Sequence, residues 1–587
     1  MCGIFAAFAN SKHYYEKYEQ IAKDLYSRGP DAEGHLNKEN IHLIHRRLSI
    51  QDLSEAGNQP LKSPCEKYAI IFNGEIYNFK ELKEELEKGG YQFKTNTDTE
   101  VLLHLYISEK ENMLYKLRGM FAFIIVNLEE NTAFAARDPY GIKPLYYAET
   151  NEGIYLCSQV KPLINSNLVD SSPSYEGQAG FWLLGSVPEP YTWYKSIKAI
   201  PSGNYIKIKN NKITSVNRWH SIGESYLNYK NKENLISNEK EIDKKIITAV
   251  RESISYHLVS DTPIGILLSG GIDSCAIAGT VSDLTKEEIK GFTVTFSDFK
   301  KTDNDETNRA IIAANKYNLK HINTEVSKKD FLEDLPSILS AMDQPSIDGF
   351  NTWYAAKSVA KSGIKVALSG IGGDEIFFGY DFYKKYSLMM KLKRKFSNLD
   401  KKSKLINLLL YFQFKRTKNP KWLSLSESLK TKKLSWFHKR SSKTFEDLFK
   451  LLPSEELKNY LSEDFFFSIV EESTGKLSSE PQIALAQLDA TLYLKNQLLK
   501  DSDWASMHHS VELRTPLVDS FLINKISPFF PYIAKNKHKA LLINSPNSPL
   551  PSEVRNAKKT GFSFPINIWI GKENQTLSVL SQSIFKK

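Results

Sequence analysis

The sequence predicts a mixed α/β protein of two to four domains, with a C-terminal part built on a parallel sheet. Length is the first observation, because 587 residues exceed what one hydrophobic core normally organises. The second is an alternation of strand-like and helix-like segments from residue 264 to residue 368, which is typical of a parallel sheet covered on both faces. The third is a pair of glycine-rich loops that each follow an apolar strand-like segment. Ligands bind such sheets at the carboxyl ends of strands, so both loops are candidate binding elements.

The first loop spans residues 267–274 and reads L-L-S-G-G-I-D-S. Gly270 and Gly271 lack side chains, so backbone N–H groups there can approach an anion, and the start of the following helix favours negative charge. Ser269 and Ser274 add hydroxyl donors. Asp273 would repel a phosphate unless a cation lay between them, which predicts Mg²⁺ bound to its carboxylate. The Walker pattern is absent, so this is another class of nucleotide loop.

The second loop spans residues 368–380 and repeats the order of strand, small residues, acids and helix. It reads L-S-G-I-G-G-D-E-I-F-F-G-Y. Asp374 is predicted to share Mg²⁺ and pyrophosphate with Asp273. Upstream, Asp343 and Asp348 are candidates for the substrate side of the site, with turn capping as the alternative interpretation.

Cys2 is the candidate nucleophile of the N-terminal part. Its small side chain permits removal of Met1, which would place a thiol and a free α-amine on one residue. An α-amine has a pKa near ~8 and can act as the base that activates the nucleophile. Residues 3–8 are apolar and predict a buried strand that holds this terminus rigid.

Polar motifs follow Cys2 in a recognisable order. R-G-P-D at 28–31 predicts a rigid turn, and H-R-R-L-S-I at 45–50 places cations at a strand end. N-G-E-I-Y-N at 73–78 follows a predicted strand at 68–72, and Asp98 is predicted to cap a helix. Further predicted strands lie at 120–126 and 132–136, and a hairpin begins near 200 and ends near 219.

Composition shifts suggest the domain boundaries. Residues 221–240 are polar and without period, which predicts a linker between a domain at 2–215 and a second at 236–587. The strands predicted after that linker are 264–268, 292–296, 321–326 and 364–368, and the helices are 242–258, 305–317, 328–342 and 352–361. Residues 384–440 are basic and apolar and predict an inserted helical segment, either a solvated face over a local core or a contact with a membrane surface or anionic partner.

Composition also excludes several classes of protein. No apolar run approaches the ~18 residues of a membrane helix, and the N-terminus lacks a signal peptide. The four cysteines are scattered without a C-x-x-C pair, which fits a reducing compartment and predicts a cytoplasmic protein. A net charge of +10 fits anionic small ligands, and no nucleic-acid signature is present.

These motifs resemble two families joined in one chain. The first 160 or so residues resemble class II glutamine amidotransferase domains, which implies a four-layer αββα N-terminal-nucleophile (Ntn) hydrolase sandwich. The loop S-G-G-I-D-S resembles the pyrophosphate loop of ATP pyrophosphatases, which implies a HUP-like parallel sheet with helical additions. Together with R-D-P-Y-G-I-K-P at 137–144 and D-W-A-S-M-H-H-S-V-E-L-R-T-P at 503–516, the motifs follow the order of bacterial glutamine-hydrolysing asparagine synthetases.

The resemblance assigns roles residue by residue. It makes Cys2 the nucleophile, and it forms the oxyanion hole from Asn73 and the Gly74 amide. By the same match the glutamine substrate would be bound by Arg47, Asn73, Glu75 and Asp98. ATP would be bound by Leu267, Ser269, Gly270, Gly271, Asp273, Ser274, Val294, Ser369, Gly370 and Lys559. Mg²⁺ would be held by Asp273 and Asp374.

Ile371 departs from the pattern of the resembled family, which commonly has an acid at this position. An isoleucine can neither accept a proton nor bind an ammonium group, so either another group performs that step or the acceptor is not aspartate. Asn96-Thr97 is a second departure, where Gly-Ser is common, and predicts altered loop geometry only.

The resemblance implies glutamine hydrolysis coupled to ATP-dependent amidation of a carboxylate through an acyl-adenylate. Aspartate is the default acceptor, with asparagine, glutamate, AMP and pyrophosphate as products. Amidation of another carboxylate, such as a uronic acid of a surface polysaccharide (O-antigen), remains as the alternative. Glucosamine-type amidotransfer and a catalytically dead binding protein are two less favoured alternatives. The expected partners are small molecules, with a homodimer left open.

Overall fold

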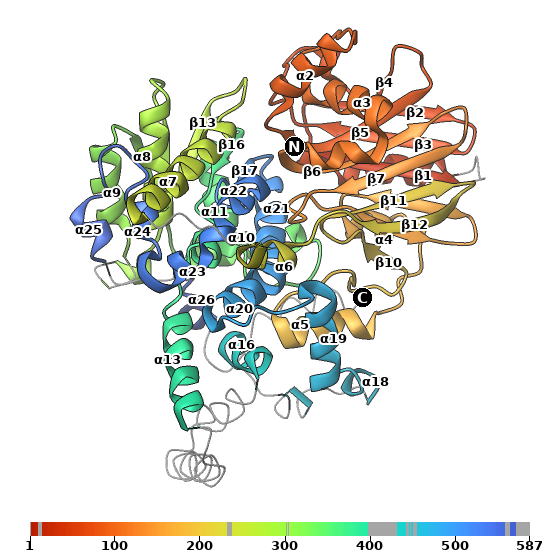
Figure 1. Ribbon diagram of the computed structural model, residues 1–587. Coiled ribbons are helices and arrows are strands. Elements are labelled where there is room, and N and C mark those ends of the chain that lie inside the picture. The colour runs from red at the N-terminus through yellow and green to blue at the C-terminus, as the bar shows by residue number, and fades with distance from the viewer. Residues whose placement is uncertain are drawn as a thin grey trace.

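The computed structural model describes residues 2–9, 14–231, 238–300, 302, 305–396, 431–441, 445, 448–449, 455–557 and 564–570. Two antiparallel six-stranded sheets form the N-terminal part (Figure 1). In order across the first sheet the strands are β10 (Ile197–Ala199), β8 (Tyr146–Glu149), β9 (Gly153–Cys157), β1 (Cys2–Ala9), β3 (Ile41–Arg47) and β2 (Ala32–Lys38). Across the second they are β12 (Lys212–Arg218), β11 (Asn204–Lys209), β7 (Thr132–Arg137), β6 (Gly119–Asn127), β5 (Tyr68–Ile76) and β4 (Leu61–Lys62).

Alternate side chains of β1 point into two different hydrophobic cores, which shows how the layers are stacked. Ile4 and Phe8 join a core with residues of the other sheet, such as Ile124. Phe5 and Ala7 point the other way, into a core that includes residues of helices α1 (Tyr15–Asp24) and α4 (Val160–Asn165). A third core packs α2 (Phe79–Lys88) and α3 (Asp98–Glu109) on the outer face of the second sheet. The apolar run after Cys2 is therefore buried on both faces, and the predicted αββα sandwich is confirmed.

Two local predictions in this domain need correction. Asn73, Gly74 and Glu75 do not follow the strand but lie within β5, which is paired with β6 as far as Ile76. Asp98 does not cap α3; Thr97 is the N-cap, and its hydroxyl accepts from the Glu100 N–H. The Asp98 side chain is thereby available for other contacts.

A parallel five-stranded sheet forms the centre of the C-terminal part, in the order β15, β14, β13, β16, β17. Its strands span Lys320–Val326, Lys290–Phe296, Ile264–Leu267, Val366–Leu368 and Glu512–Arg514. The order reverses between β13 and β16, and both glycine-rich loops leave the sheet at that point. Such a reversal is where parallel sheets bind ligands. The predicted parallel sheet is confirmed.

Helices cover both faces of this sheet. One hydrophobic cluster joins β13 to α7 (Glu239–Tyr256), α8 (Ile272–Leu284) and α9 (Thr307–Lys316), and two others join its strands to α10 (Lys328–Ala341) and α11 (Phe350–Lys361). The remaining helices include α5 (Tyr175–Leu184), α12 (Gly373–Ile376), α13 (Asp381–Phe396), α18 (Glu455–Lys458), α19 (Glu463–Thr474), α20 (Pro481–Leu488), a π-helical stretch (Asp489–Leu499) and α21 (Lys500–Met507). After β17 come α22 (Ser520–Ile526), α23 (Phe530–Tyr532), α24 (Ala540–Ile543), α25 (Ser552–Arg555) and α26 (Ile566–Trp569).

Part of the predicted linker has regular structure. It contains α6 (Ile222–Ser225), and Ile222 and Tyr226 are buried in the largest hydrophobic cluster. This segment folds because apolar residues recur within its otherwise polar sequence. Those apolar residues pack against the C-terminal part.

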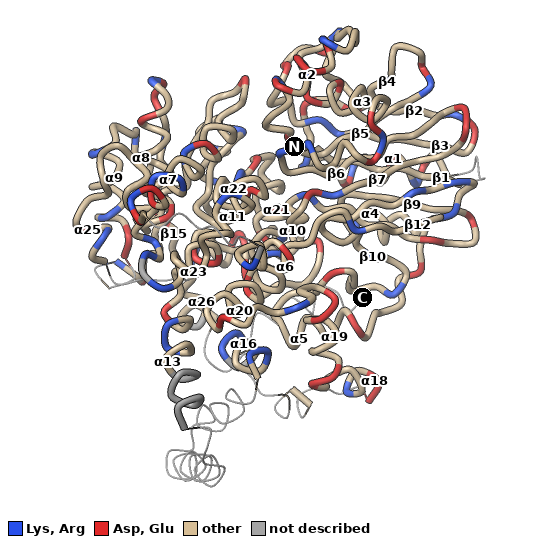
Figure 2. Tube along the Cα trace, viewed as in Figure 1, with Lys and Arg blue, Asp and Glu red and all other residues tan. Residues whose placement is uncertain are grey.

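The predicted basic insertion lies only partly within the described residues. At its end, α16 (Lys432–Arg440) buries Trp436 and Phe437 in the core while its Lys and Arg residues gather around it (Figure 2). The Arg440 Nε donates to Asp489 Oδ1 at 2.8 Å. This packing fits the interpretation of a solvated face over a local core.

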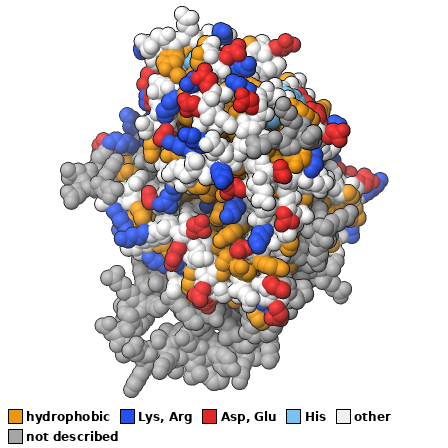
Figure 3. Space-filling view, turned by 90° about the vertical axis from the view of Figure 1, so that its right-hand side faces the viewer, with side chains coloured by type: hydrophobic (Ala, Val, Ile, Leu, Met, Phe, Trp, Pro, Cys, Tyr) orange, Lys and Arg blue, Asp and Glu red, His pale blue; other side chains and the backbone are white. Residues whose placement is uncertain are grey.

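The side view of the molecule shows acidic and basic side chains interspersed over its described surface (Figure 3). Among the described residues, no helix is long and apolar enough to cross a membrane.

Candidate active sites

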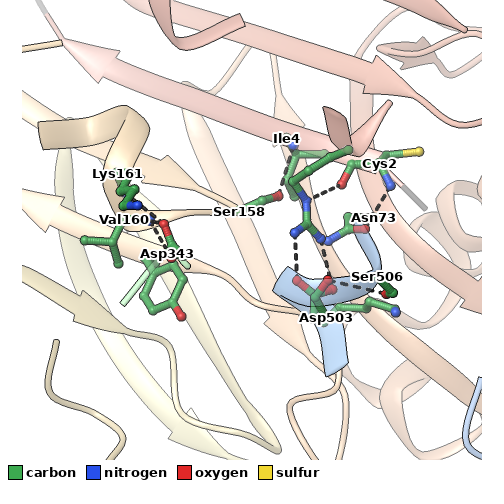
Figure 4. A network of polar contacts seen from close by, with 12 residues as sticks. Cys2, Ile4, Asn73, Ser158, Val160, Lys161, Asp343, Asp503 and Ser506 are labelled. Carbon is green, nitrogen blue, oxygen red and sulfur yellow. Dashed lines mark hydrogen bonds and ion pairs between the residues drawn. The ribbon is translucent and has the colours of Figure 1, made fainter. Parts of the chain in front are cut away.

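Cys2 begins β1 and lies beside Asn73 of β5 (Figure 4). Its backbone nitrogen donates to Asn73 Oδ1 at 3.0 Å, so the two sheets are joined at this point. The side-chain Nδ2 of Asn73 is buried and makes no hydrogen bond within the described structure. A buried donor without a partner is costly, and it is the group that an oxyanion hole requires.

The environment of the Cys2 thiol balances two effects. Burial raises its pKa, while the positive chain terminus, the Leu48 backbone N–H and the Arg47 guanidinium favour the thiolate. The net direction is upward, which agrees with a side chain only 7% exposed. A base is therefore needed to activate this thiol near neutral pH.

Gly74 follows Asn73 and faces β6 at close range. A Cβ atom at this position would lie 2.1 Å from the carbonyl oxygen of Met120 and 2.7 Å from Cα of Phe121. Only glycine fits here, because real Cβ contacts are never so short. The close approach fixes the backbone next to Asn73.

Glu75 and Asp98 lie buried near Cys2. Asp98 Oδ2 accepts from the Ile76 N–H at 2.9 Å, and Glu75 Oε2 accepts from Gln51 Nε2 at 2.9 Å. Burial and Glu512 of β17 raise the pKa of Glu75 well above its usual range, and burial raises that of Asp98 to about 6. Two buried acids with raised pKa values are suited to a cationic ligand, because a positive charge beside them would favour their ionised forms.

The Arg47 guanidinium is hydrogen-bonded to the loop that follows it in the chain. Its Nη1 donates to the Ser54 carbonyl at 2.7 Å and to Asn58 Oδ1 at 2.9 Å, and its Nη2 donates to the carbonyl groups of Gln51 and Asp52. The guanidinium thus shapes the segment that carries Gln51, the partner of Glu75.

Arg28 is a buried residue of this region to which the sequence had assigned no role. Its Nε donates to the Cys2 carbonyl at 3.2 Å, and its Nη1 and Nη2 donate to the two carboxylate oxygens of Asp503 at 2.7 and 3.0 Å. Asp503 lies on α21 of the C-terminal part, close to Cys2 and Asn73 in Figure 4. The only signal in the sequence was the R-G-P-D turn at 28–31.

The second site lies where β13 and β16 end. Gly270 has φ +71°, a left-handed conformation that favours glycine, and allows the loop to turn into α8. The Ser269 N–H donates to Ser274 Oγ at 3.2 Å, which closes the loop on itself. Leu267 and Val294, two of the predicted ATP contacts, share one hydrophobic cluster at the carboxyl ends of β13 and β14.

The two glycine-rich loops are in contact. A Cβ on Gly373 would lie 2.5 Å from Cγ of Asp273, and one on Gly370 would lie 2.9 Å from its Cβ. The Ser369 N–H donates to the Arg514 carbonyl of β17 at 2.8 Å, which places the second loop at the sheet edge. The structure therefore brings Asp273 and Asp374 together, as predicted from the sequence.

Lys539 joins the two acids and was missed by sequence reasoning. Its Nζ lies 2.6 Å from Asp273 Oδ2 and 2.5 Å from Asp374 Oδ1. Burial lowers the pKa of Lys539 and the two carboxylates raise it, with a net upward direction. Nothing local marks this lysine, which lies 266 residues from Asp273. Lys559, predicted to contact the ATP phosphates, lies outside the described residues.

The paired carboxylates fit a divalent cation. The Lys539 ammonium shows that a positive charge is accommodated between them. Carboxylate oxygens are also the ligands that Mg²⁺ prefers. The close approach of the two glycine-rich loops depends on glycine at position 373, where a side chain would collide with Asp273.

The fold and the two sites define a two-domain glutamine-dependent amidotransferase, in which an Ntn-type domain is joined to a nucleotide-binding α/β domain. Residues 1–220 match the family model of a glutamine amidotransferase domain, and residues 245–585 match that of asparagine synthase. The chain belongs to the asparagine synthase family, whose members are ATP-using, glutamine-hydrolysing ligases.

Similar proteins agree with this family over nearly the whole chain. "Asparagine synthetase [glutamine-hydrolyzing] 1" of Bacillus subtilis is 32% identical, across 98% of this chain and 88% of the relative. A "Putative asparagine synthetase [glutamine-hydrolyzing]" of Mycobacterium bovis is 29% identical, across 97% and 88%. "Asparagine synthetase [glutamine-hydrolyzing] 3" of Bacillus subtilis is 25% identical, across 96% and 87%.

Proposed function

We propose that this enzyme converts aspartate to asparagine, with glutamine as the nitrogen donor and with glutamate, AMP and pyrophosphate as the other products. The name shared by the relatives supports aspartate as the acceptor. The observation that carries the proposal is that one chain places the Cys2–Asn73 pair and the Asp273–Asp374 pair on either side of an interface rich in buried polar contacts.

In the first half-reaction the Cys2 thiol attacks the side-chain amide of glutamine. Once Met1 is removed, the α-amine of Cys2 takes the thiol proton and passes it to the leaving ammonia. Asn73 Nδ2 and the Gly74 N–H stabilise the oxyanion of the tetrahedral intermediate. Water then releases glutamate from the thioester.

The remaining residues of this half-site orient glutamine. The Glu75 and Asp98 carboxylates bind its α-ammonium, whose charge offsets the cost of ionising two buried acids. Arg47 exchanges part of its contacts with the loop for the α-carboxylate of glutamine.

In the second half-reaction the aspartate side-chain carboxylate attacks the α-phosphate of ATP and displaces pyrophosphate. Backbone groups of Gly270, Gly271 and Gly370, the hydroxyls of Ser269, Ser274 and Ser369, and the Lys539 ammonium bind the phosphates, and Leu267 and Val294 line the adenosine pocket. Lys559 remains a predicted phosphate contact. Asp273 and Asp374 would hold Mg²⁺, which offsets phosphate charge.

Ammonia must reach the acyl-adenylate unprotonated, because ammonium has no lone pair. A closed route between the two sites prevents its protonation by bulk water. A cavity within the domain interface, lined by residues of both domains, supports such a route.

The test measures pyrophosphate, glutamate and asparagine made from ATP, Mg²⁺, glutamine and aspartate, with galacturonic acid as the competing acceptor. Cys2→Ala should abolish glutamine-dependent asparagine formation and keep formation from ammonium chloride. Cys65→Ser, at an exposed cysteine, is the matched control. Unchanged glutamine-dependent amidation in Cys2→Ala would refute the nucleophile, and amidation of galacturonic acid alone would refute aspartate.

A further inference from the structure

A cavity with several charged side chains in its lining lies at the interface of the two domains. The glutaminase side contributes Arg137, Tyr146, Ser158 and Glu189, and the synthetase side contributes the loop 343–346 and residues of the helix that ends in α21. Asp503, the partner of Arg28, is one of its lining residues, so the cavity begins one side chain away from Cys2. Its lining also includes Asp501, which no step described so far uses.

Asp501 lies on α21 and lines this cavity. It is only 3% exposed, and its carboxylate is held by two neutral donors. Ser346 Oγ donates to its Oδ2 at 2.7 Å, and Trp504 Nε1 donates to its Oδ1 at 2.8 Å. The Trp504 ring belongs to the hydrophobic cluster that contains Leu267 and Val294. Trp504 thus links Asp501 to the hydrophobic cluster that also contains the proposed adenosine contacts.

The other three acids of the cavity are committed to structural contacts. Asp343 accepts from the backbone N–H groups of Val160 and Lys161, each at 2.9 Å. Asp503 is bound by both Nη atoms of Arg28. Glu189 pairs with Arg137 at 2.7 Å. Asp501, held by neutral donors, keeps its capacity to take up a proton.

The chemistry of amide formation requires a proton acceptor within reach of the reacting nitrogen. When neutral ammonia adds to the acyl-adenylate carbonyl, a C–N bond forms and the nitrogen becomes positively charged. One N–H proton must leave before the carbonyl re-forms and the C–O bond to AMP breaks; otherwise ammonia is expelled instead. Ile371, in the loop beside the nucleotide, offers no basic atom.

We propose that the Asp501 carboxylate accepts this proton from the ammonia adduct, so that the adduct collapses to amide and AMP. The inference rests on the proposed adenylation chemistry and deepens it by naming the base. The proton then passes from Asp501 to water at the end of each turnover, so the carboxylate is regenerated and atoms and charge balance.

The electrostatics of the cavity fit this role. Burial and the nearby Asp348 raise the pKa of Asp501 to about 7, while Ser346, Trp504 and the Lys500 ammonium oppose the shift. Lys500, on the same helix, has its pKa lowered to about 8 by burial. The carboxylate is therefore basic enough to take a proton near neutral pH, yet is ionised in a sizeable fraction of molecules. The charged groups that line the rest of the cavity are Arg137, Glu189, Asp343, Lys495 and Asp503.

The test uses the full-length enzyme with glutamine, ATP and Mg²⁺, and with aspartate and galacturonic acid as acceptors. Asp501→Asn should keep glutaminase activity and acceptor-dependent ATP–pyrophosphate exchange within about threefold of wild type. Amide formation should fall by about 10²- to 10⁴-fold, the usual range for loss of a general base. Asp464→Asn, at an exposed acid of α19, is the matched control and should change none of these rates.

Asp348→Asn provides a readout that a structural role would not move. Removing the Asp348 charge should lower the pKa of Asp501 and shift the acidic limb of amide formation to lower pH. Wild-type amide rates in Asp501→Asn, or a parallel loss of exchange and amide, would overturn the proposal. If Asp501→Asn does not fold, an unmoved acidic limb in Asp348→Asn overturns it and a shifted limb supports it. Failure of the wild type to use aspartate would refute only the acceptor, because the same comparison is then made with galacturonic acid.

Discussion

The Arg28 guanidinium binds both carboxylate oxygens of Asp503 across the domain interface and at the same time donates to the carbonyl of Cys2. Asp503 lies two residues after Asp501 on α21, so one buried ion pair joins the Cys2 backbone to the helix that lines the interdomain cavity. The neighbourhood of Cys2 is therefore joined to α21 of the C-terminal part by a buried ion pair.

Arg28→Ala should destabilise the protein and uncouple its two reactions. Removing one partner of a buried ion pair leaves an uncompensated charge and costs about 3–5 kcal/mol. Thermal unfolding should show a lower midpoint, and more glutamate should form per asparagine because ammonia escapes. Arg28→Lys, which keeps the charge but not the two-pronged geometry, should show a smaller effect. An unchanged ratio of glutamate to asparagine in a folded Arg28→Ala protein would contradict the coupling.

Asn73→Ala should lower the kcat of glutamine hydrolysis by about 10²- to 10³-fold, the cost of losing one oxyanion donor. The physical reason is that Asn73 Nδ2 is a buried donor with no partner in the described structure, which the developing oxyanion would satisfy. Steady-state glutaminase assays and ammonia-dependent synthesis should be compared. Asn151→Ala, in the exposed turn between β8 and β9, serves as the control. Equal loss of both activities in Asn73→Ala would point to misfolding instead.

Lys539→Met should lower pyrophosphate release by about 10- to 100-fold, because a charge-assisted bond to a phosphate contributes roughly 1.5–3 kcal/mol. Without the ammonium, Asp273 and Asp374 would also repel each other until a cation binds. Glutamine hydrolysis, at the other site, should not change. The comparison variant is Lys535→Met, at an exposed lysine of the same region. Full pyrophosphate release by Lys539→Met would exclude a role in phosphate binding.

Asp98 should make stability and glutamine binding depend on pH in opposite directions. Its pKa is raised to about 6 in the folded protein, so its contribution to stability is present below about pH 4 and is lost as the pH rises through about 6. In the proposed mechanism ionised Asp98 binds the glutamine α-ammonium, so the KM for glutamine should fall over the same interval. Asp98→Asn should raise the melting temperature at pH 8 and flatten the pH dependence of KM. A KM that still falls with pH in this variant would assign the effect to another group, such as Glu75.

Local pattern was sufficient for the buried N-terminal strand and for the two glycine-rich loops. The apolar run after Cys2 predicted a buried strand, and the structure shows β1 buried on both faces. The S-G-G-I-D-S and S-G-I-G-G-D-E loops predicted a shared site, and Gly373 of one loop does pack against Asp273 of the other. Local pattern was misleading at Asp98, because Asp and Thr both favour the N-cap position of a helix. In the structure Thr97 is the N-cap, and the Asp98 side chain accepts from the Ile76 N–H instead.

The sequence by itself predicted two domains and a cysteine nucleophile, and it determined the position of both glycine-rich loops, because each depends on residues close together in the chain. Only the tertiary structure decided the pairings of Arg28 with Asp503 and of Lys539 with Asp273, whose members are 475 and 266 residues apart. It also placed Asp501 in a cavity shared by both domains. Periodicity and turn chemistry act over a few residues, whereas a buried charge is located by the surfaces that exclude water around it, and those surfaces exist only when the domains pack together.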